Sequence, residues 1–344
     1  YGVSGPLHMW IAAFLRDREQ YVRIENCLSP TVCVRSGVPQ GSVLGPILFI
    51  LYINDVTDIL VDDVSCKLYA DDLKLYCPIV PTLGFSESLQ TSLDNLCDWS
   101  LKWQLPINVD KSFFVTISRN NICNCVHSYR ILCSLLTRRF SVDDLGIAYD
   151  CNLCFDNYVN NIASSAKAKV GLLFRSFKTR DPALLKRAYV TYIRPKLEYA
   201  SNLWNPFHKT TIAVLENVQR YFTRRIPSLS IFSYEERLAM LNLDTLEKRR
   251  LKSDLVLYYK ILHGLSSIPA SAFDTYNTCS VSRSKSSLLR KNIAGTQACY
   301  FSFFNRAVDC WNVLPSSLTD ASSLSVFRSR LDMTDLSHYC TVLA

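Results

Sequence analysis

The 344-residue sequence predicts a mixed α+β fold followed by an entirely helical region, and three observations support this prediction. Residues 1–156 alternate short strand-like runs with amphipathic segments at helical spacing. From residue 157 onward, helical spacing and helix caps replace the strand signals. The charge balance changes at nearly the same point, since residues 1–166 hold 12 Lys and Arg against 17 Asp and Glu, whereas residues 167–260 hold 19 against 8.

The first elements are predicted from apolar spacing and from capping residues. An amphipathic helix should begin behind Ser4 as its N-cap, with Pro6 in its first turn, where a missing backbone N–H costs nothing. Two alternating runs, residues 21–24 and 31–35, are expected to form a strand pair. A loop rich in Gly and Pro, residues 36–42, should then lead into an apolar helix.

The rest of the first region contains one hairpin, one helix and one strand. The apolar helix should end near Asn54, and residues 67–76 have the pattern of a tight β-hairpin with acidic residues at its tip. Apolar residues at helical spacing predict a helix over residues 89–103. Residues 113–118 are predicted to form a strand.

Capping signals define the helices of the second region. Gly264 stands where the last long helix should stop, because glycine adopts the left-handed backbone that often ends a helix. Two capping boxes are predicted, each with a glutamate three residues after the cap: Ser233 with Glu236, and Asp244 with Glu247. The pattern therefore divides the chain into residues 1–156, a helical domain 157–264, a Ser-rich linker 265–296, and a helical region 297–344.

Composition excludes some classes of protein and favours others. With 49% apolar residues the chain can bury a core, so a globular protein is expected. The longest apolar run, residues 43–53, is too short for a membrane span, and we expect no membrane partner. The basic segment suggests a polyanionic partner such as nucleic acid, although a solvated helix surface would have the same composition.

The sharpest chemical feature is the pair Asp71 and Asp72 at the expected hairpin tip. Two adjacent carboxylates repel by about 4 kcal/mol at about 4 Å and an effective dielectric constant of about 20, unless water or a cation relieves them. Mg²⁺ prefers such oxygen ligands, and two Mg²⁺ ions can activate a hydroxyl and stabilise a leaving group in an in-line displacement. The alternative interpretation is an ordinary acidic turn held in water.

A second motif changes the balance between these interpretations. Residues 36–46 read Ser-Gly-Val-Pro-Gln-Gly-Ser-Val-Leu-Gly-Pro and precede Tyr-Ala-Asp-Asp at residues 69–72. In order and spacing, these motifs closely resemble the reverse transcriptases of non-LTR retrotransposons, of the LINE-like and jockey-like kind. The resemblance implies an RNA-directed DNA polymerase that uses dNTPs, an RNA template, a DNA primer or target DNA, and two Mg²⁺ ions.

The resemblance also assigns roles to individual residues. It implies Asp71 as the main metal ligand and Asp72 as its partner, with Lys111, behind the motif of residues 103–108, as an acid that protonates the leaving pyrophosphate. The hairpin at Leu145 and Gly146 resembles the family's primer grip. The residues expected to line the nucleotide and template are Pro39, Gln40, Gly41, Ser42, Tyr69 and Ala70.

In the architecture that the resemblance implies, residues 1–156 are a partial polymerase palm and residues 157–264 a basic helical thumb. Further family-like motifs at residues 192–200, 219–223 and 311–315 extend the match over nearly the whole chain. A thumb of this kind would clamp the template–primer duplex through its phosphates. The candidate contacts are Lys167, Lys169, Arg175, Lys178, Arg220, Arg224 and Arg225.

The resemblance fails at one catalytic position. The family takes a further aspartate from an earlier palm strand, and the first acid of this chain, Asp17, has the sequence context of a surface charge between Arg16 and Arg18. We therefore expect that the polypeptide alone does not polymerise DNA. Two other hypotheses remain open: a non-catalytic nucleic-acid-binding remnant of a degraded element, and a viral RNA-dependent RNA polymerase, against which the loop and thumb motifs argue.

Two cysteine groups are candidates for zinc sites: Cys123, Cys125 and His127 in one, and Cys151 with Cys154 in the other. A structural zinc ion needs four ligands in paired spacing, and these groups do not match that pattern well. No secretion signal is present in the sequence, and the family resemblance implies a nuclear and cytoplasmic location.

Overall fold

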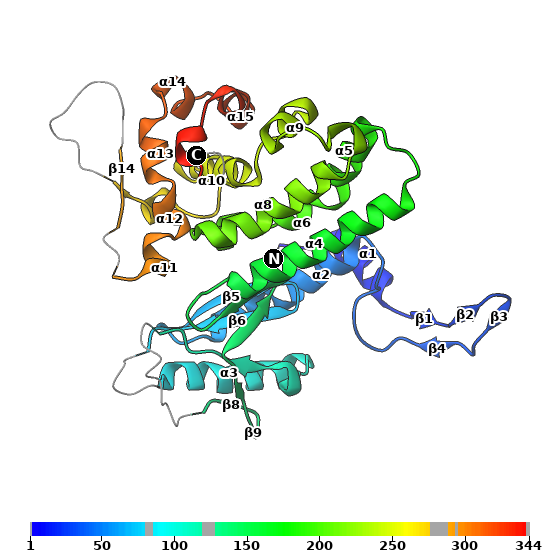
Figure 1. Cartoon of the computed structure of the whole chain (residues 1–344). Helices are drawn as coiled ribbons and strands as arrows, with labels where there is room; N and C mark the ends of the chain where they lie inside the picture. The colour runs from blue at the N-terminus through cyan, green and yellow to red at the C-terminus, as the bar shows by residue number, and fades with distance from the viewer. Residues whose placement is uncertain (1, 80–84, 119–127, 276–287, 293–294, 342–344) are drawn as a thin grey trace. The chain divides into compact units, whose positions relative to one another are not determined.

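The computed structural model describes residues 2–79, 85–118, 128–275, 288–292 and 295–341. Helices and small two-stranded sheets are mixed along the chain, as the sequence predicts (Figure 1). The chain divides into two compact units, which are described separately. Unit 1 comprises Tyr1–Phe114 and Asn120–Arg139, and unit 2 comprises Val115–Arg119 and Phe140–Ala344. The four-part division predicted from the sequence stays a prediction.

Unit 1 begins with α1 (Gly5–Leu15), which follows Ser4 as N-cap as predicted. A narrow antiparallel ribbon comes next: β1 (Glu19–Gln20) pairs with β4 (Val32–Cys33), and β2 (Arg23–Ile24) pairs with β3 (Cys27–Leu28). The predicted pairing of residues 21–24 with 31–35 is therefore wrong in register, because the chain reverses sooner. Glu25 adopts a left-handed backbone, with a φ of 53°, and closes the tight turn between β2 and β3.

The centre of unit 1 packs a helix against a hairpin. The apolar helix α2 (Leu44–Ile53) passes at Asn54 into the 3₁₀ helix η1 (Asn54–Ile59). The hairpin β5 (Ser65–Tyr69) and β6 (Asp72–Tyr76) follows, and then α3 (Glu87–Trp103), which begins at the Ser86 cap. One small core joins these elements, with Val56, Leu96 and Trp99 buried at its centre and one side of the hairpin packed against them.

The predicted strand at residues 113–118 is shorter in the structure. After the 3₁₀ turn η2 (Val109–Lys111), β7 covers only Phe113–Phe114 and pairs in parallel with β10 (Thr137–Arg138). The partner strand is itself two residues long, so no ladder is available to extend β7. The short hairpin β8 (Arg130–Ile131) and β9 (Ser134–Leu135) lies against α3, where Tyr129 and Ile131 enter a second small core with Leu93.

Unit 2 opens with a hairpin and continues as a helical bundle. The hairpin pairs β11 (Ser141–Asp144) with β12 (Ile147–Asp150). The first bundle helices are long or are broken into short pieces, and Figure 1 shows α4 running beside α6 and α8. Their bounds are α4 (Asp156–Ser176), α5 (Pro182–Tyr192), α6 (Arg194–Glu198), α7 (Ser201–Trp204) and α8 (Lys209–Arg224).

The bundle is held by one continuous apolar core. Val170 of α4, Tyr189 of α5 and Leu215 and Phe222 of α8 are fully buried in it. The Tyr189 and Phe222 rings stack with their centroids 4.3 Å apart. Burial of side chains of this size contributes about 1.5–3 kcal/mol each, so this core is a main source of the stability of unit 2.

Two helices follow with caps that test the predicted capping boxes. The helix α9 (Tyr234–Leu241) has the complete box of Ser233 and Glu236, as predicted, and α10 (Leu246–Leu262) ends just before Gly264, which has a φ of 67°. The predicted box of Asp244 and Glu247 is wrong. Thr245 is the cap, accepting the Lys248 N–H, because the Asp244 carboxylate is bound to the Lys248 and Lys252 ammonium groups instead.

The C-terminal elements pack on α10. The 3₁₀ turn η4 (Ala270–Ala272) leads into the strand pair β13 (Asp274–Thr275) and β14 (Leu289–Arg290). Five short helices and a 3₁₀ turn follow: α11 (Gln297–Tyr300), α12 (Phe303–Arg306), α13 (Val308–Val313), α14 (Ser316–Thr319), α15 (Leu324–Met333) and η5 (Ser337–Tyr339). Their core is built on Tyr258, Tyr259, Trp311 and Phe327.

The 3₁₀ turn η3 (Pro227–Leu229) joins α8 to α9. Within the described ranges, no helix combines the length and the apolar character needed to cross a membrane.

Candidate functional site

The acidic pair lies at the tip of the β5–β6 hairpin. Tyr69 faces Asp72 in the last register pair, so Ala70 and Asp71 form a two-residue turn, for which Ala70 adopts a φ of 52°. Both aspartates are exposed, and Tyr69 beside them is 66% exposed. The predicted position of these carboxylates at a hairpin tip is therefore confirmed, with the difference that Asp72 is the first residue of β6 and not part of the turn.

The hairpin has one apolar and one polar face, because side chains alternate along each strand. Leu68, Leu73 and Leu75 pack towards the core that Val56 centres. The opposite face carries Asp72, and next to it Lys67 lies directly across from Lys74. Like charges placed across two strands are destabilising.

The hairpin is positioned by bonds between its supporting helices. The Tyr52 hydroxyl of α2 donates to the Trp103 carbonyl of α3, and the indole Nε1 of Trp99 donates to an Asp55 carboxylate oxygen at 3.0 Å. Both hydrogen bonds join the α2–η1 segment to α3. These elements together form the surface on which the hairpin packs. Sequence reasoning included Trp103 in the motif of residues 103–108 but missed the links made by Tyr52, Asp55 and Trp99, because nothing local distinguishes these residues from other helix residues.

The loop before α2 is closed by its own polar groups. The Ser42 hydroxyl donates to the Pro39 carbonyl at 2.7 Å and accepts the Gly45 N–H at 2.9 Å. A Cβ at Gly45 would lie 2.7 Å from the Pro39 oxygen, so only glycine fits there. Gln40 and Gly41 remain exposed at the apex, with a φ of 78° at Gly41. Of the four predicted loop residues, Ser42 and Pro39 thus use their polar groups within the loop.

Lys111 is the last residue of η2, and its side chain is exposed. The turn is fixed by Asn108, whose side-chain oxygen accepts the Lys111 backbone N–H at 3.2 Å. The ammonium group is thus carried on a capped turn of unit 1. Its predicted role as an acid stays a prediction.

No group of three or more His, Cys, Asp or Glu side chains gathers at a metal-binding distance within the described ranges. Asp71 and Asp72 therefore supply two carboxylates and no third ligand from the described part of the chain. Of the two candidate zinc groups, the second places the Cys154 sulfur 3.6 Å from an Asp156 carboxylate oxygen. Cys123, Cys125 and His127 lie outside the described residues.

The predicted hairpin at Leu145 and Gly146 is present in unit 2. Both residues adopt positive φ, 48° and 81°, and close the turn between β11 and β12. The Tyr199 hydroxyl donates to the Leu145 carbonyl at 3.0 Å and ties the turn to the end of α6. Glycine at the second position leaves the backbone accessible, while the first position keeps an exposed leucine.

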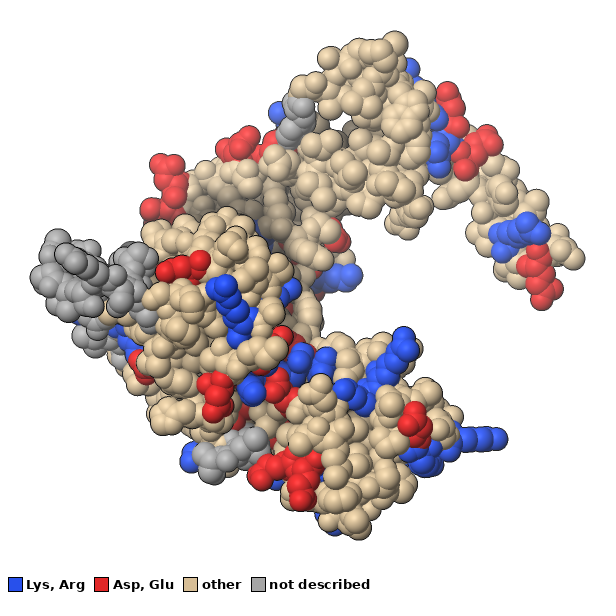
Figure 2. Space-filling model, turned by 90° about the horizontal axis from the view of Figure 1, so that it is seen from above, with Lys and Arg blue, Asp and Glu red and all other residues tan. Residues whose placement is uncertain are grey.

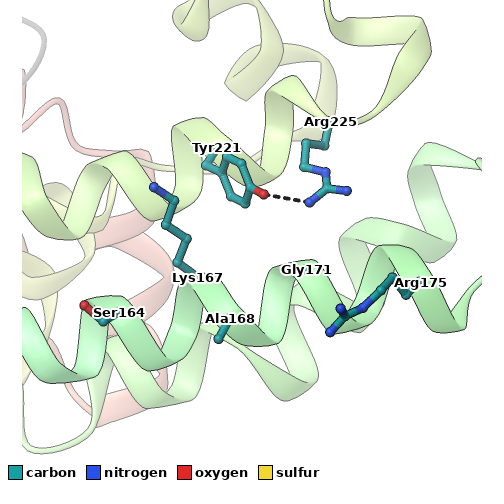
Figure 3. A pocket seen from close by; sticks show the side chains of 7 residues that line it. All are labelled: Ser164, Lys167, Ala168, Gly171, Arg175, Tyr221 and Arg225. Carbon is teal, nitrogen blue, oxygen red and sulfur yellow. Dashed lines mark hydrogen bonds between the residues drawn. The ribbon is translucent and has the colours of Figure 1, made fainter.

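A groove of about 570 Å³ lies between α4 and α8 of unit 2. Ser164, Ala168 and Gly171 form its floor on α4, where their spacing places them on one helix face (Figure 3). Its cationic lining consists of Lys167, Arg175 and Arg225, and Tyr221 completes it.

The seven predicted basic contacts are only partly brought together. Three of them, Lys167, Arg175 and Arg225, line the groove. Arg220 lies instead over the Tyr234 ring, 4.5 Å from its centroid. The remaining three are exposed but are not among the residues that line the groove: Lys169, Lys178 and Arg224. On the face shown in Figure 2, basic and acidic side chains are interspersed, so charge alone does not mark a site.

A buried polar network joins α8 to α9 and α10. Glu216, 1% exposed, accepts hydrogen bonds from the Tyr234 hydroxyl and from the Leu246 N–H at the start of α10. Burial raises the pKa of the Glu216 carboxyl, although Tyr234, Arg250 and the backbone bonds oppose this effect. Gln219 adds a bond from its amide to the Tyr234 oxygen at 3.1 Å. The network thus fixes the angle at which α8 meets α9 and α10.

The fold and the hairpin site agree with the comparisons to known families. Residues 2–157, a little under half of the chain, match the family described as reverse transcriptase (RNA-dependent DNA polymerase). This match confirms the resemblance drawn from the Ser36–Pro46 and Tyr69–Asp72 motifs, and the alternative of a viral RNA polymerase is not favoured. Polymerases of this family generally use divalent metal ions.

Curated relatives specify the kind of reverse transcriptase. An RNA-directed DNA polymerase from the mobile element jockey of Drosophila funebris is 27% identical over 233 residues, which are 65% of this chain and 25% of that protein. A probable RNA-directed DNA polymerase from transposon X-element of Drosophila melanogaster is 25% identical over 245 residues, 67% of this chain and 26% of that protein. These matches support a non-LTR retrotransposon origin.

An uncharacterized protein of Caenorhabditis elegans is 32% identical over 126 residues, which are 36% of this chain and 64% of that protein. The jockey polymerases are much longer, and the chain spans about a quarter of their length. No solved structure gives a significant match.

Proposed function

We propose that this chain is the part of a retrotransposon reverse transcriptase that supplies the paired aspartates of the polymerase site and grips the template–primer. In this proposal residues 1–156 are a partial palm and residues 157–264 a thumb. The observation that carries it is the exposed Asp71–Asp72 pair at a hairpin tip. In the sequence this pair follows a closed Gly-rich loop, in the order found in the family.

The chemistry of the hairpin fits Mg²⁺. Two adjacent exposed carboxylates offer hard oxygen ligands and repel each other without a cation. Mg²⁺ bound there would supply the positive charge that activates a primer hydroxyl and neutralises the departing pyrophosphate. Gln40, Gly41 and Tyr69 are exposed and free to contact a nucleotide or template. In this proposal the exposed Lys111 acts as the acid. Lys67, across from Lys74, would face the phosphates of the primer.

The same geometry argues that the chain alone does not polymerise. Within the described ranges no third acidic, His or Cys side chain joins Asp71 and Asp72. Loss of one metal ligand removes two-metal catalysis in large steps. The chain is therefore proposed to bind RNA template, DNA primer and dNTPs without joining them.

The test measures the affinity of the full chain for a labelled DNA primer on an RNA template, with dTTP present, with and without Mg²⁺. We expect Mg²⁺ to tighten binding about tenfold or more, because the ion bridges the carboxylates to phosphate oxygens. The variant Asp71→Asn with Asp72→Asn should lose this gain. Primer extension is measured in the same samples, and no incorporation is expected.

The chain contains a matched control for this variant. Asp62 and Asp63 are also adjacent and exposed, and they lie in a turn just before β5. Replacing both by Asn changes the charge equally and should leave the Mg²⁺ effect intact. Equal loss in both variants would mean that the hairpin pair is only an acidic turn. Binding that never responds to Mg²⁺ would favour the hypothesis of a non-catalytic nucleic-acid-binding remnant.

A further inference from the structure

We infer that Asp55 is a positioning residue for the Asp71–Asp72 pair. It fixes the surface beneath the β5–β6 hairpin and thereby sets how tightly the two carboxylates hold Mg²⁺. The inference rests on the proposed function and deepens it, since that function places Mg²⁺ at the hairpin tip. Asp55 itself lies in η1, away from the tip, and it acts through Trp99 of α3.

Asp55 belongs to a series of four hydrogen bonds that joins residues 52–61 to α3. The four bonded pairs are Tyr52 with Trp103, Asp55 with Trp99, Ile59 with Asn95, and Val61 with Ser92. The partners on α3 follow one another at intervals of three or four residues, so they share one face of the helix. The two segments run antiparallel along this face, and we call the bonded residues the α3 seam.

The Asp55 bond differs from the other three bonds of the α3 seam because its acceptor is charged. The indole Nε1 of Trp99 donates to the carboxylate at 3.0 Å, and Trp99 is only 7% exposed. The neighbouring bond, from the Asn95 amide to the Ile59 carbonyl at 2.9 Å, joins neutral groups. A hydrogen bond with an ionised partner is about twice as strong as a neutral one, and a buried N–H without an acceptor is costly. Loss of the Asp55 carboxylate should therefore loosen the α3 seam at its middle.

The hairpin is connected to the α3 seam through the chain. The Val61 N–H donates to the Ser92 hydroxyl of α3 at 3.1 Å, which ends the seam. The Val61 carbonyl then accepts the N–H of Val64 at 2.9 Å, and Val64 is buried. Strand β5 begins at the next residue. The first residue of the hairpin is therefore held at a fixed distance from α3.

The hairpin is also connected to the α3 seam through packing. Leu68 and Leu73 form the register pair next to Tyr69 and Asp72, and both leucines pack on the core that contains Trp99. A shift of the Trp99 ring would move this pair and, one step further along the strands, the tip. Mg²⁺ demands near-ideal octahedral geometry at about 2.0–2.1 Å. A tip that samples several positions binds the ion less tightly, in proportion to the time it spends outside the competent one.

The first experiment titrates Mg²⁺ into the full chain with a labelled DNA primer on an RNA template and dTTP. It measures the Mg²⁺ concentration that gives half of the gain in affinity. Asp55→Ala should raise this concentration about fivefold or more, because the tip is then competent for a smaller fraction of the time. Asp55→Asn removes the same charge but keeps an oxygen that accepts the Trp99 N–H, so it should stay within about twofold of the wild type. An Asn variant as impaired as the Ala variant would contradict the route through Trp99.

Two matched variants separate positioning from charge and from stability. Asp58 is exposed in the same 3₁₀ helix, so Asp58→Ala removes an equal charge without touching the α3 seam. Ile131 is buried with Leu93 in the other core of unit 1, so Ile131→Ala destabilises the unit at a different place. Both variants should keep the wild-type Mg²⁺ midpoint. A shift in Ile131→Ala as large as that in Asp55→Ala would show that Asp55 only stabilises the unit.

A spectroscopic measurement follows the α3 seam without metal or nucleic acid. The Trp99 and Trp103 rings lie 6.4 Å apart, and the Tyr52 ring meets Trp103 edge-on at 5.3 Å. Near-ultraviolet circular dichroism of such a group depends on fixed packing. Asp55→Ala should lower this aromatic signal, whereas Asp55→Asn should retain it. A full signal in Asp55→Ala would show that the seam holds without the carboxylate and would overturn the inference.

The wild-type titration separates failure of the proposed function from failure of this inference. If the affinity of the wild type never responds to Mg²⁺, the metal role of the hairpin tip fails, and the positioning role of Asp55 fails with it. If the wild type responds and Asp55→Ala responds at the same Mg²⁺ concentration, only the positioning role fails.

Discussion

The buried carboxylate of Glu216 shows how a single residue couples charge to the arrangement of helices. It is an acceptor for Tyr234 and for the first N–H of α10, and it is almost completely removed from water. Nothing about Glu216 in the sequence signals burial of its charge, because glutamate side chains on amphipathic helices are mostly exposed. Its environment is created by α9 and α10, which follow later in the chain.

This burial predicts how stability depends on pH. Because the pKa of Glu216 is raised above its ordinary 4.5, the folded state binds the proton more tightly than the unfolded state does. The free energy of unfolding should therefore fall as pH rises from about 4.5 to the folded pKa, by about 1.4 kcal/mol for each pH unit that separates the two pKa values. In Glu216→Gln this decline should disappear, as measured by urea unfolding at a series of pH values.

A neighbouring glutamate provides the comparison. Glu235 is exposed in the first turn of α9, and Glu235→Gln removes the same charge without touching the network. Its pH profile should follow that of the wild type. A profile of Glu216→Gln that also follows the wild type would show that the carboxyl is not the group responsible.

The residues of the hairpin site could be predicted from the sequence. For the groove, the sequence indicated the basic residues as a group but not which of them line it. Asp71 and Asp72 stand in a local motif whose turn geometry is set by adjacent residues. The cations Lys167, Arg175 and Arg225 follow from charge, but the sequence does not separate them from Lys169 or Arg224. That separation depends on which faces of α4 and α8 meet, and hence on tertiary packing.

Between elements, one buried ion pair joins three helices of unit 2. Asp254 of α10, 1% exposed, accepts two bonds from the Arg306 guanidinium at 2.8 and 2.7 Å. It also accepts from the Asn202 amide of α7 at 2.9 Å and from Asn205 at 3.3 Å. The C-terminal helices are therefore fastened to the bundle through polar groups as well as through the aromatic core.

Removing one partner of this pair should be costly. Asp254→Ala leaves the largely buried Arg306 charge without a carboxylate to neutralise it, and we expect a loss of about 3–5 kcal/mol in the free energy of unfolding. Asp254→Asn, which keeps one acceptor oxygen and nearly the same side-chain volume, should lose less. Urea unfolding followed by circular dichroism measures both changes.

The control for this prediction is an exposed ion pair between another aspartate and a lysine. Asp332 binds Lys252 at 2.9 Å, but its side chain is 67% exposed. Asp332→Ala should cost no more than about 1 kcal/mol. Comparable losses at Asp332 and Asp254 would contradict the view that burial sets the value of the pair.

Elements with strong local signals were predictable, and those that depend on partners were not. The helices α1, α3 and α9 follow from apolar spacing and caps. The strand predicted at residues 113–118 shrinks to two residues because its partner is equally short. The cap predicted at Asp244 is displaced to Thr245 because two lysines of α10 bind that carboxylate. Both errors come from interactions with residues outside the local pattern.

At the scale of the whole molecule, the two units differ in how much apolar surface each buries. The cores of unit 1 are two small clusters around Val56 and Leu93. Unit 2 contains the two large clusters built on Phe222 and on Tyr258. Because stability grows with buried apolar area, the units should not share one stability.

Hydrogen exchange should show this difference directly. We expect the amides of α1 and α2 to exchange rapidly, through local opening of these helices. The amides of α4, α8 and α10 should exchange slowly, at rates close to those set by global unfolding. Mass spectrometry of peptides from each unit measures both rates. The peptides of α3, which is the best buried helix of unit 1, should lie between these limits. Uniform protection over the whole chain would show instead a single cooperative unit.

The exposed helix α1 also provides an optical handle. Of the five tryptophans, Trp10 on α1 is 55% exposed, whereas Trp99, Trp204 and Trp311 are at most 7% exposed and Trp103 is half-buried. A soluble quencher such as acrylamide will therefore reach Trp10 first, and the emission it removes will come mainly from α1. A protein segment that binds to this helix will shield Trp10, so acrylamide will quench less of the tryptophan emission. Binding can therefore be detected without an added label.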